Sequence, residues 1–330
     1  MQSPNFYQNI QKYLNLSLKL ATGGAGILSI SLLALYKYQQ KIIYHPTIPG
    51  LPKLSEENGY PYRNPKDKNL DYKDIEVTTE DNVKIRGWFI KQKFQSEKAP
   101  TVIFFHENAG NLGTRLDFFK YYHDIVQCNI IAFAYRGYDK SQDAEINQKG
   151  IQQDVKAIFK YVFNLPNIDK TQIYTHGRSL GGATSIHGVV DFIQINKENS
   201  DNQQQQNQNC QIQHKIQGMV IENTFTSIKD VGKTIFPKFI MNLANILLKN
   251  KWNSIECIKN IQEMPMLFII SEKDEIIPCQ QMYKLQEQAK KQSNNQVKQY
   301  VIKNGDHNCN WQVDKVEYFK QLKQFINPSL

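Results

Sequence analysis

The sequence predicts an α/β fold in which a mostly parallel central sheet is covered by helices on both faces. Short apolar runs without polar interruption, such as TVIFF at 101–105 and NIIAFAY at 129–135, are typical of strands buried on both sides. Stretches with helical spacing alternate with these runs, which indicates parallel strands joined by helical crossovers. With 40% apolar residues in a chain of 330, a large core can form.

The expected elements follow one another in a consistent order. A turn at 80–82 separates strand-like segments at 74–79 and 83–91, which indicates a hairpin at the start of the domain. The other expected strands are 101–105, 129–135, 172–174, 216–221, 266–270 and 297–302, and the expected helices are 112–126, 150–163, 180–192 and 311–326.

The N-terminal region carries an uncharged apolar run. After a tail at 1–19, residues 20–36 contain no charged side chain, and lysines flank them on both sides. The run is at the short end of what crosses a bilayer as a helix, so we expect a single-pass membrane anchor. A cleaved signal peptide and a buried helix of the globular domain are the alternative interpretations.

Three other segments depart from the strand–helix alternation. Residues 37–70 contain many prolines and charges and are expected to form an extended linker ahead of a folded domain at 71–330. Residues 194–214 are rich in Asn and Gln and are expected to be a flexible insertion. Residues 235–252 are apolar and lie between two strands, where they are a candidate for a small cap over the carboxyl ends of the strands.

Composition excludes several classes of partner. The net charge of +9 is spread along the chain without a basic block, so no nucleic-acid partner is expected, and a weak attraction to anionic membrane lipids is what remains. The five cysteines are far apart and form no C-x-x-C pair, which argues against a disulfide framework and a zinc site. We expect neither a metal nor a cofactor.

The central chemical signal is a G-x-S-x-G motif at 177–181. It follows a predicted strand and opens a predicted helix, which is the context of a nucleophile elbow. Such a turn holds Ser179 in a strained conformation with its hydroxyl above the sheet, and the glycines avoid clashes with neighbouring backbone. The alternative is a glycine-rich turn that only packs a helix. We expect Ser179 to be a nucleophile.

A serine nucleophile needs a histidine base that is oriented by a carboxylate. For a nucleophile elbow of this kind, the chain order is Ser, then acid, then His. Asp274 is the expected acid, because it lies in the loop that follows the strand at 266–270. Glu222, just after the preceding strand, is the alternative acid, whereas Glu272 and Glu275 are interpreted as solvated neighbours.

His307 is the expected base. It lies in the loop between the last strand and the last helix, and Gly305 lets this loop bend toward Ser179. Five other histidines fit no such position and are interpreted as structural or solvent-facing: His45, His123, His176, His187 and His214.

Acyl transfer also needs two backbone N–H groups that bind the developing oxyanion. The residue after the nucleophile, Leu180, is expected to supply one of them. The second is expected in the loop at 106–111, from Asn108 or, as second choice, from Glu107. The histidine and glutamate at the start of this loop do not continue as H-E-x-x-H, because position 110 is Gly, so a zinc protease is not indicated.

Several motifs together resemble a known family. The matching segments are FFHENAGNLGTR (104–115), AYRGYDKSQ (134–142), GRSLGG (177–182), ENTFTSI (222–228), SEKDEIIP (271–278) and GDHNCNW (305–311). They resemble the α/β-hydrolase domain-containing protein 13 and bud-emergence-46-like group. The resemblance covers about residues 70–326 and implies an α/β-hydrolase fold behind one N-terminal membrane anchor, with Ser179, Asp274 and His307 as the triad. Glu107 differs from the glycine that many members carry there.

The expected function is that of a membrane-anchored serine hydrolase. It would cleave an ester or thioester, with acyl lipids or S-acylated proteins as expected substrates because the anchor places the site near lipid. A peptidase or an acyltransferase would use the same elbow. A non-catalytic scaffold at the membrane is the alternative from another class, and an intact triad argues against it.

Overall fold

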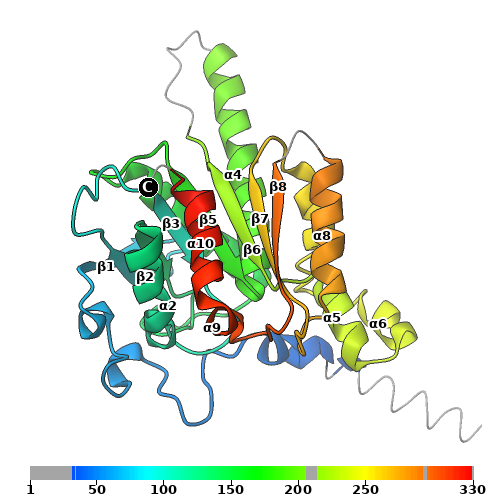
Figure 1. Ribbon diagram of the computed structural model, residues 1–330. Coiled ribbons are helices and arrows are strands. Elements are labelled where there is room, and N and C mark those ends of the chain that lie inside the picture. The colour runs from blue at the N-terminus through cyan, green and yellow to red at the C-terminus, as the bar shows by residue number, and fades with distance from the viewer. Residues whose placement is uncertain (1–31, 34, 206–213, 293–295, 329–330) are drawn as a thin grey trace, which may run out of the picture.

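A computed structural model describes residues 32–33, 35–205, 214–292 and 296–328 (Figure 1). Within this part of the chain, eight strands form one twisted sheet in the order β1-β2-β4-β3-β5-β6-β7-β8. The strands are β1 Tyr72–Thr78, β2 Lys84–Ile90, β3 Thr101–Phe105, β4 Asn129–Phe133, β5 Ile173–Arg178, β6 Gly218–Glu222, β7 Met266–Ser271 and β8 Val297–Ile302.

The direction of the strands divides the sheet into two parts. β1 and β2 form the predicted hairpin, in which Thr78 pairs with Lys84, and β2 runs antiparallel to β4. From β4 to β8 every neighbouring pair is parallel. All residues of β3, β4, β6 and β7 are buried, as their uninterrupted apolar sequences predict for strands covered on both faces. The mostly parallel α/β architecture is therefore confirmed.

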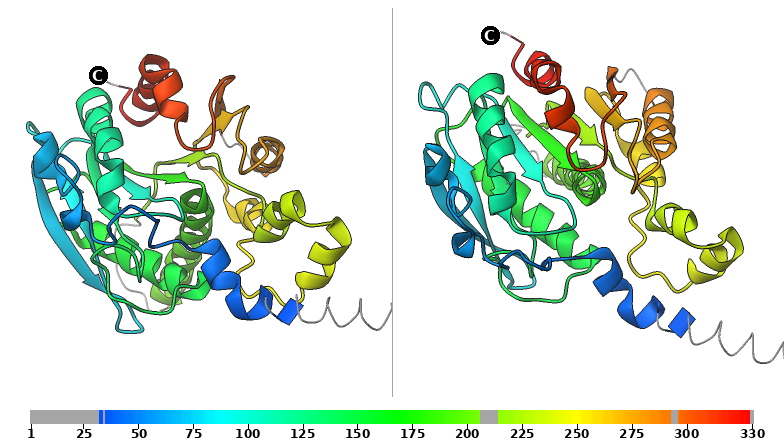
Figure 2. Two further views of the ribbon diagram at one scale, coloured as in Figure 1. Left: turned by 90° about the horizontal axis from the view of Figure 1, so that it is seen from below. Right: turned by 60° about the horizontal axis from the view of Figure 1, so that its bottom comes forward.

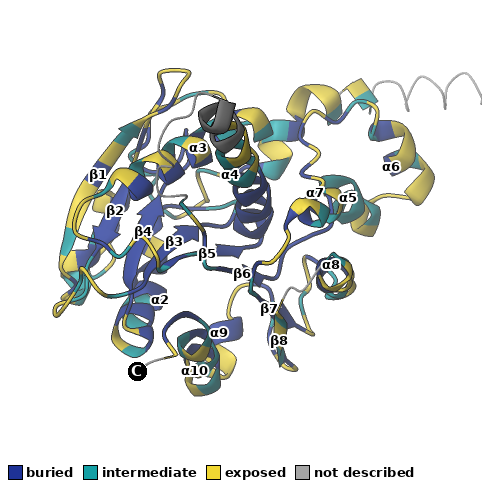
Figure 3. Ribbon diagram, turned by 90° about the horizontal axis from the view of Figure 1, so that it is seen from above, coloured by how far each residue is buried: buried dark blue, intermediate teal, exposed yellow. Residues whose placement is uncertain are grey.

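Helices cover the sheet from both sides (Figure 3). α3, α4 and α8 lie on one face, and α2 and α10 lie on the other. The start of α3 is fixed by Asn147, whose side chain accepts a hydrogen bond from the N–H of Gly150 at 2.8 Å. The helices named here are α2 Leu116–Tyr121, α3 Gln148–Asn164, α4 Leu180–Gln205, α8 Gln280–Lys291 and α10 Lys315–Ile326.

Two helices differ from the sequence-based expectation. α4 continues to Gln205, well past residue 192, so the first part of the Asn- and Gln-rich segment is helical. Residues 206–213, the core of the predicted insertion, lie outside the described residues. α8 was not predicted, although Met282, Leu285 and Ala289 recur at helical spacing and are buried against the sheet.

The segment at 37–70 is packed on the domain, in contrast to the extended linker that its composition predicts. Residues 35–43 are helical, and Tyr44 and Leu70 are part of the main core. The Tyr44 hydroxyl bonds to Asn250 at 3.0 Å and accepts the indole N–H of Trp252 at 2.9 Å. Buried polar side chains thus hold the segment in place despite its prolines and charges.

The predicted membrane anchor falls almost entirely on residues that the structure does not describe, since 20–31 and 34 lie outside it. Among the described residues, no helix has both the length and the apolar character needed to span a bilayer.

The apolar stretch after β6 contains two short helices. α5 spans Ile228–Ile235 and α6 spans Lys238–Ala244, with Pro237 at the boundary between them. α5 begins at Ser227, whose hydroxyl accepts the N–H of Asp230. We call α5 and α6 together the cap. It begins seven residues before the expected residue 235 and projects from the end of the sheet where the 35–43 helix also lies (Figure 2).

Candidate active site

The turn between β5 and α4 has the geometry of a nucleophile elbow. Ser179 has a φ of 55°, in the left-handed region that a non-glycine residue seldom adopts. Its N–H bonds to the carbonyl of Glu222 on β6 at 2.9 Å, which ties the turn to the neighbouring strand. A Cβ atom on Gly177 would collide with the carbonyl of Gly181, and one on Gly181 would collide with the carbonyl of Phe105. Both motif glycines are therefore required by close backbone packing.

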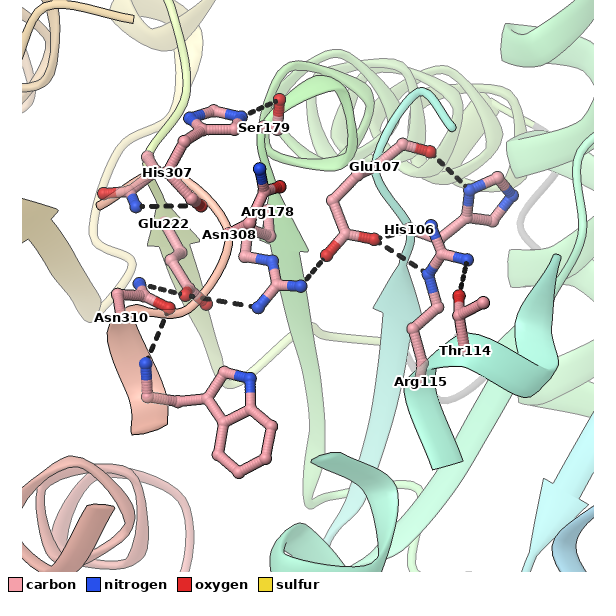
Figure 4. A network of polar contacts seen from close by, with 12 residues as sticks. His106, Glu107, Thr114, Arg115, Arg178, Ser179, Glu222, His307, Asn308 and Asn310 are labelled. Carbon is pink, nitrogen blue, oxygen red and sulfur yellow. Dashed lines mark hydrogen bonds and ion pairs between the residues drawn. The ribbon is translucent and has the colours of Figure 1, made fainter. Parts of the chain in front are cut away.

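Three side chains from separate loops meet above this turn. The Oγ of Ser179 lies 2.9 Å from Nε2 of His307, as drawn in Figure 4, and Nδ1 of His307 lies 2.7 Å from Oδ2 of Asp274. The His307 ring and the Asp274 carboxyl are almost completely buried. The structure thus brings the three predicted residues into one hydrogen-bonded row, with the imidazole between the hydroxyl and the carboxylate.

Asp274 and His307 are each held by further bonds. The second carboxylate oxygen of Asp274 accepts the N–H groups of Ile276 and Ile277, so this side chain is fixed before it reaches the imidazole. Glu275 also takes part, because its carboxylate accepts the backbone N–H of His307 at 3.1 Å. The interpretation of Glu275 as a solvated neighbour was incomplete, since the residue is exposed but its carboxylate braces the histidine loop.

Asn223 is a supporting residue that the sequence did not suggest. Its side-chain amide exchanges hydrogen bonds with the hydroxyl and the N–H of Ser271 at 2.9 Å each. The same amide nitrogen reaches the carbonyl of Asp306 at 3.3 Å. Asn223 has a φ of 42°, a conformation that asparagine tolerates better than most residues. It therefore links the strand that carries Asp274 to the loop that carries His307.

Glu222, the alternative acid, serves a different network below the triad. Its carboxylate lies 2.7 Å from the His176 ring and accepts bonds from Asn310 and from the hydroxyl of Tyr318. All of these side chains are buried, and Figure 4 shows Glu222 and Asn310 beneath the His307 loop. The carboxylate that meets the His307 ring is that of Asp274.

Glu107 lies between two arginines in the floor of the site. One carboxylate oxygen accepts the Arg115 Nε–H at 2.8 Å, and the other is paired with Arg178, the residue before the nucleophile (Figure 4). Burial pushes the pKa of the Glu107 carboxyl upward, but the charges of Arg178 and Arg115 together outweigh burial and hold this pKa below its usual range. The ion pairs connect the 106–111 loop to the elbow.

The 106–111 loop is fixed from both sides. Nε2 of His106 accepts the backbone N–H of Tyr135 at 3.2 Å, which leaves Nδ1 to donate to the carbonyl of Glu107 at 2.6 Å. Burial lowers the pKa of His106 to about 3, so the ring is neutral and can hold both bonds. The carbonyl of Asn108 accepts the N–H of His45 at 2.8 Å. The loop is thereby held in one conformation.

The two expected oxyanion donors border the same cavity as the nucleophile. Asn108 and Leu180 both line the cavity that contains Ser179 and His307. Within the described residues, no hydrogen bond runs from the backbone N–H of Asn108 or of Leu180 to another protein group. Their positions suit oxyanion donors, and this assignment stays a prediction.

The cavity beside Ser179 has a volume of about 710 Å³ and mostly apolar walls. The 35–43 helix forms one wall through Leu35, Ile42 and Ile43, and the cap forms another. Core and cap residues that contribute to the lining include Phe225, Ile228, Val231, Ile235, Met241 and Leu248. A cavity of this size and character can hold an extended hydrocarbon group beside the hydroxyl.

No protein-family model matches the chain. It is 33% identical over 266 residues to the protein bem46 of Schizosaccharomyces pombe, with 80% of each chain covered. It is 32% identical over 314 residues to the alpha/beta hydrolase domain-containing protein WAV2 of Arabidopsis thaliana, with 92% of each chain covered. The chain belongs to the α/β-hydrolase family. A relative in Saccharomyces cerevisiae, 26% identical over 292 residues with 88% of this chain and 90% of the relative covered, is named an uncharacterized membrane protein.

Solved structures agree with the α/β-hydrolase fold. An esterase of Pyrococcus furiosus superposes with a TM-score of 0.62 at 21% identity, covering 84% of this chain and 98% of its own. An alpha-beta hydrolase of Vibrio vulnificus gives a TM-score of 0.61 at 18% identity, covering 82% and 88%. The resemblance inferred from the sequence motifs is therefore confirmed at the level of family and fold.

Proposed function

We propose that the protein is a serine hydrolase that cleaves a carboxylic ester or thioester through an acyl-enzyme. The observation that carries the proposal is the 2.9 Å contact between Ser179 Oγ and His307 Nε2, with Asp274 on the other ring nitrogen. This geometry lets the imidazole accept the hydroxyl proton as the oxygen attacks. The strained backbone of Ser179 supports the same role, because it directs the hydroxyl into the cavity.

The proposed reaction has two steps, acylation of Ser179 and hydrolysis of the acyl-serine. Ser179 Oγ attacks the carbonyl carbon while His307 takes its proton, and the N–H groups of Leu180 and Asn108 bind the oxyanion. When the tetrahedral intermediate collapses, His307 gives the proton to the leaving alcohol or thiol. Water then attacks the acyl-serine with His307 as base, which releases the acid and regenerates the hydroxyl. Asp274 keeps the imidazole in the required tautomer and stabilises its cation.

The apolar cavity favours a substrate with a hydrocarbon acyl chain. Acyl lipids and S-acylated proteins carry such chains, and both occur at membranes. We propose further that residues 20–36 anchor the protein in a membrane, which would place the cavity near these substrates. The naming of one relative as a membrane protein supports this step.

An active-site probe tests the proposal directly. A fluorophosphonate should label the full chain, and Ser179→Ala should abolish labelling because it removes the proposed nucleophile. Hydrolysis of p-nitrophenyl esters of graded chain length should fall by about 10³-fold or more in the same variant. Ser185→Ala is the matched control, since this buried hydroxyl bonds to Thr175 and is not part of the cavity lining, and the variant should keep its labelling.

The alternatives give different results in the same experiments. Folded wild-type protein that neither labels nor hydrolyses any ester would support the scaffold and contradict the proposal. Acyl transfer to an added alcohol that exceeds transfer to water would indicate an acyltransferase. Cleavage of peptide amides in preference to esters would indicate a peptidase.

A further inference from the structure

Large apolar side chains are exposed around the mouth of the cavity. Ile235, Phe236 and Ile42 line the cavity and are also exposed, so they form its edge. Further out, Phe239 on the cap is 69% exposed, and Ile246, just after α6, is 78% exposed. We call the exposed apolar side chains at this end the rim: Leu33, Ile42, Ile235, Phe236, Phe239 and Ile246. Large apolar side chains exposed together at one end of a protein are typical of an interaction site.

The rim is built from two segments that hold each other in place. Met241, Ala244 and Leu248 form a small second core against Leu32 and Leu35. The buried side-chain oxygen of Gln39 accepts the N–H groups of Lys249 and Asn250 at 2.8 and 3.2 Å. Figure 2 shows the cap and the 35–43 helix together at one end of the molecule. The two segments therefore present their exposed side chains as one unit.

The charge on these segments is mainly positive. Residues 32–55 and 231–255 contain seven lysines and no acidic residue. Lys37, Lys41, Lys238 and Lys249 are exposed there. The one acid at the start of the cap, Asp230, is paired with Lys233 at 2.6 Å. Gln40 on the 35–43 helix bonds to the exposed Glu145, so the flanking charge is mainly positive. An apolar surface flanked mainly by lysines complements an anionic lipid bilayer, whose headgroups attract lysine and whose acyl region accepts the apolar side chains.

The sequence ahead of the 35–43 helix also favours a membrane next to the rim. The 35–43 helix is directly preceded by the uncharged run that begins at residue 20. Tyr36 and Tyr38 lie exposed on its first turns, with Lys249 4.4 Å from the centre of the Tyr36 ring. Tyrosine and lysine in this arrangement are typical of the level of the lipid headgroups. The rim thus lies next to the point at which the chain would leave a membrane.

We infer that the rim docks on the surface of an anionic bilayer, so that the cavity mouth opens directly onto lipid. Docking has a consequence for the substrate, which would carry a long acyl chain and pass from the lipid into the cavity without crossing water. Only this consequence rests on the proposed function. Anchoring through residues 20–36 would keep the domain near the bilayer, and docking through the rim would fix which face it presents.

Fluorescence quenching tests the contact independently of catalysis. The full chain is reconstituted in vesicles of phosphatidylcholine and phosphatidylserine that contain a lipid with a quencher on its acyl chain. Phe239→Trp is compared with Phe94→Trp, which lies in the β2–β3 connection and is 86% exposed, and with wild type as background. The Phe239→Trp emission should be quenched strongly and the Phe94→Trp emission should not. Equal quenching at the two positions would overturn docking.

Two further outcomes concern what covers the rim. Quenching of the Phe239→Trp variant that is equally strong in phosphatidylcholine alone would overturn the role assigned to the lysines. If protein concentration alone shields this variant from a soluble quencher, while lipid does not, a second copy of the chain covers the rim and the bilayer is excluded as its partner.

An activity assay tests the consequence for the substrate. In Phe239→Asp with Ile246→Asp, hydrolysis of a long-chain ester presented in vesicles should fall about tenfold, because charged side chains oppose docking. Hydrolysis of a water-soluble short-chain ester should stay within about twofold of wild type. The control pair, Phe94→Asp with Val316→Asp, should change neither rate. Equal loss on both esters would contradict the inference, and a wild type without esterase activity would contradict the proposed function while the quenching result stood.

Discussion

At the scale of single residues, Glu107 links the residues proposed for catalysis to the stability of the fold. Its carboxylate is the countercharge for Arg115 and Arg178, and all three side chains are buried. Arg178 is adjacent in sequence to Ser179, and Glu107 is adjacent to Asn108, whose N–H is proposed for the oxyanion. One ion-pair system therefore sets the distance between the nucleophile and this donor. A glycine at position 107 could not supply this countercharge.

Glu107→Gln should destabilise the protein by about 3–5 kcal/mol, because Arg115 loses its buried countercharge and Arg178 is left with the more distant Glu222 carboxylate, at 3.9 Å. The free energy of unfolding from urea titrations measures the loss. In the matched control, Glu76→Gln, the carboxylate removed pairs with Arg86 on the surface, and the unfolding midpoint should not move. An unchanged unfolding midpoint for the Glu107 variant would show that the two arginines do not need this carboxylate as a buried countercharge.

At the scale of elements, the strands and the loops that carry Asp274 and His307 could be predicted. The residues that link these loops and strands to one another could not. The parallel strands were recognisable because burial on both faces leaves uninterrupted apolar runs, and the acid and the base follow such strands directly. Asn223 and Glu107 act through partners that are distant in sequence, and no local pattern reveals such pairs. The 37–70 segment was misjudged because its prolines and charges conceal the few residues, such as Tyr44, that anchor it in the core.

α8 and the cap show two other limits of sequence reasoning. α8 mixes buried Gln281 and Gln286 with its apolar residues, which obscures the periodicity. In the cap, Pro237 divides one apolar stretch into two helices whose packing depends on the 35–43 helix. That helix precedes the cap by almost 200 residues, so the contact could not be read from either segment alone.

Gln39 is the polar link between the 35–43 helix and the cap. Gln39→Leu should cost about 1–3 kcal/mol, because the N–H groups of Lys249 and Asn250 lose their buried acceptor. The loosened wall should also raise KM for long-chain esters more than for short ones. Gln40→Leu removes an exposed bond to Glu145 and should affect neither quantity. Equal KM changes for both chain lengths would show that this wall does not contact the acyl chain.

At the scale of the whole molecule, burial of neutral histidines makes stability depend on pH. Burial lowers the pKa of His106 to about 3 and that of His187 to about 4. In the unfolded chain both protonate near pH 6.5. Between these values the unfolded state binds more protons than the folded state, so the free energy of unfolding falls as the pH decreases. Asp154 acts in the opposite direction, because burial raises its pKa to about 6.

His187→Gln isolates one of these contributions. Between pH 7 and pH 5 the wild type should lose about 2 kcal/mol more stability than the variant. The reason is that the buried His187 of the wild type stays neutral in the fold but is protonated in the unfolded chain, whereas the glutamine of the variant does not titrate. Both proteins keep Asp154 and His106, so their contributions cancel in the comparison. Urea titrations at the two pH values measure the difference. Parallel pH profiles would mean that His187 is protonated equally in the folded and unfolded states.

The two ends of the described chain lie at opposite ends of the sheet. The 35–43 helix lies beside the cavity, whereas α10 runs away from it and ends on the far side, where the tip of α4 also projects (Figure 1). A purification tag, a fluorescent protein or an attachment to a sensor chip can therefore be placed at the carboxyl terminus without obstructing the cavity.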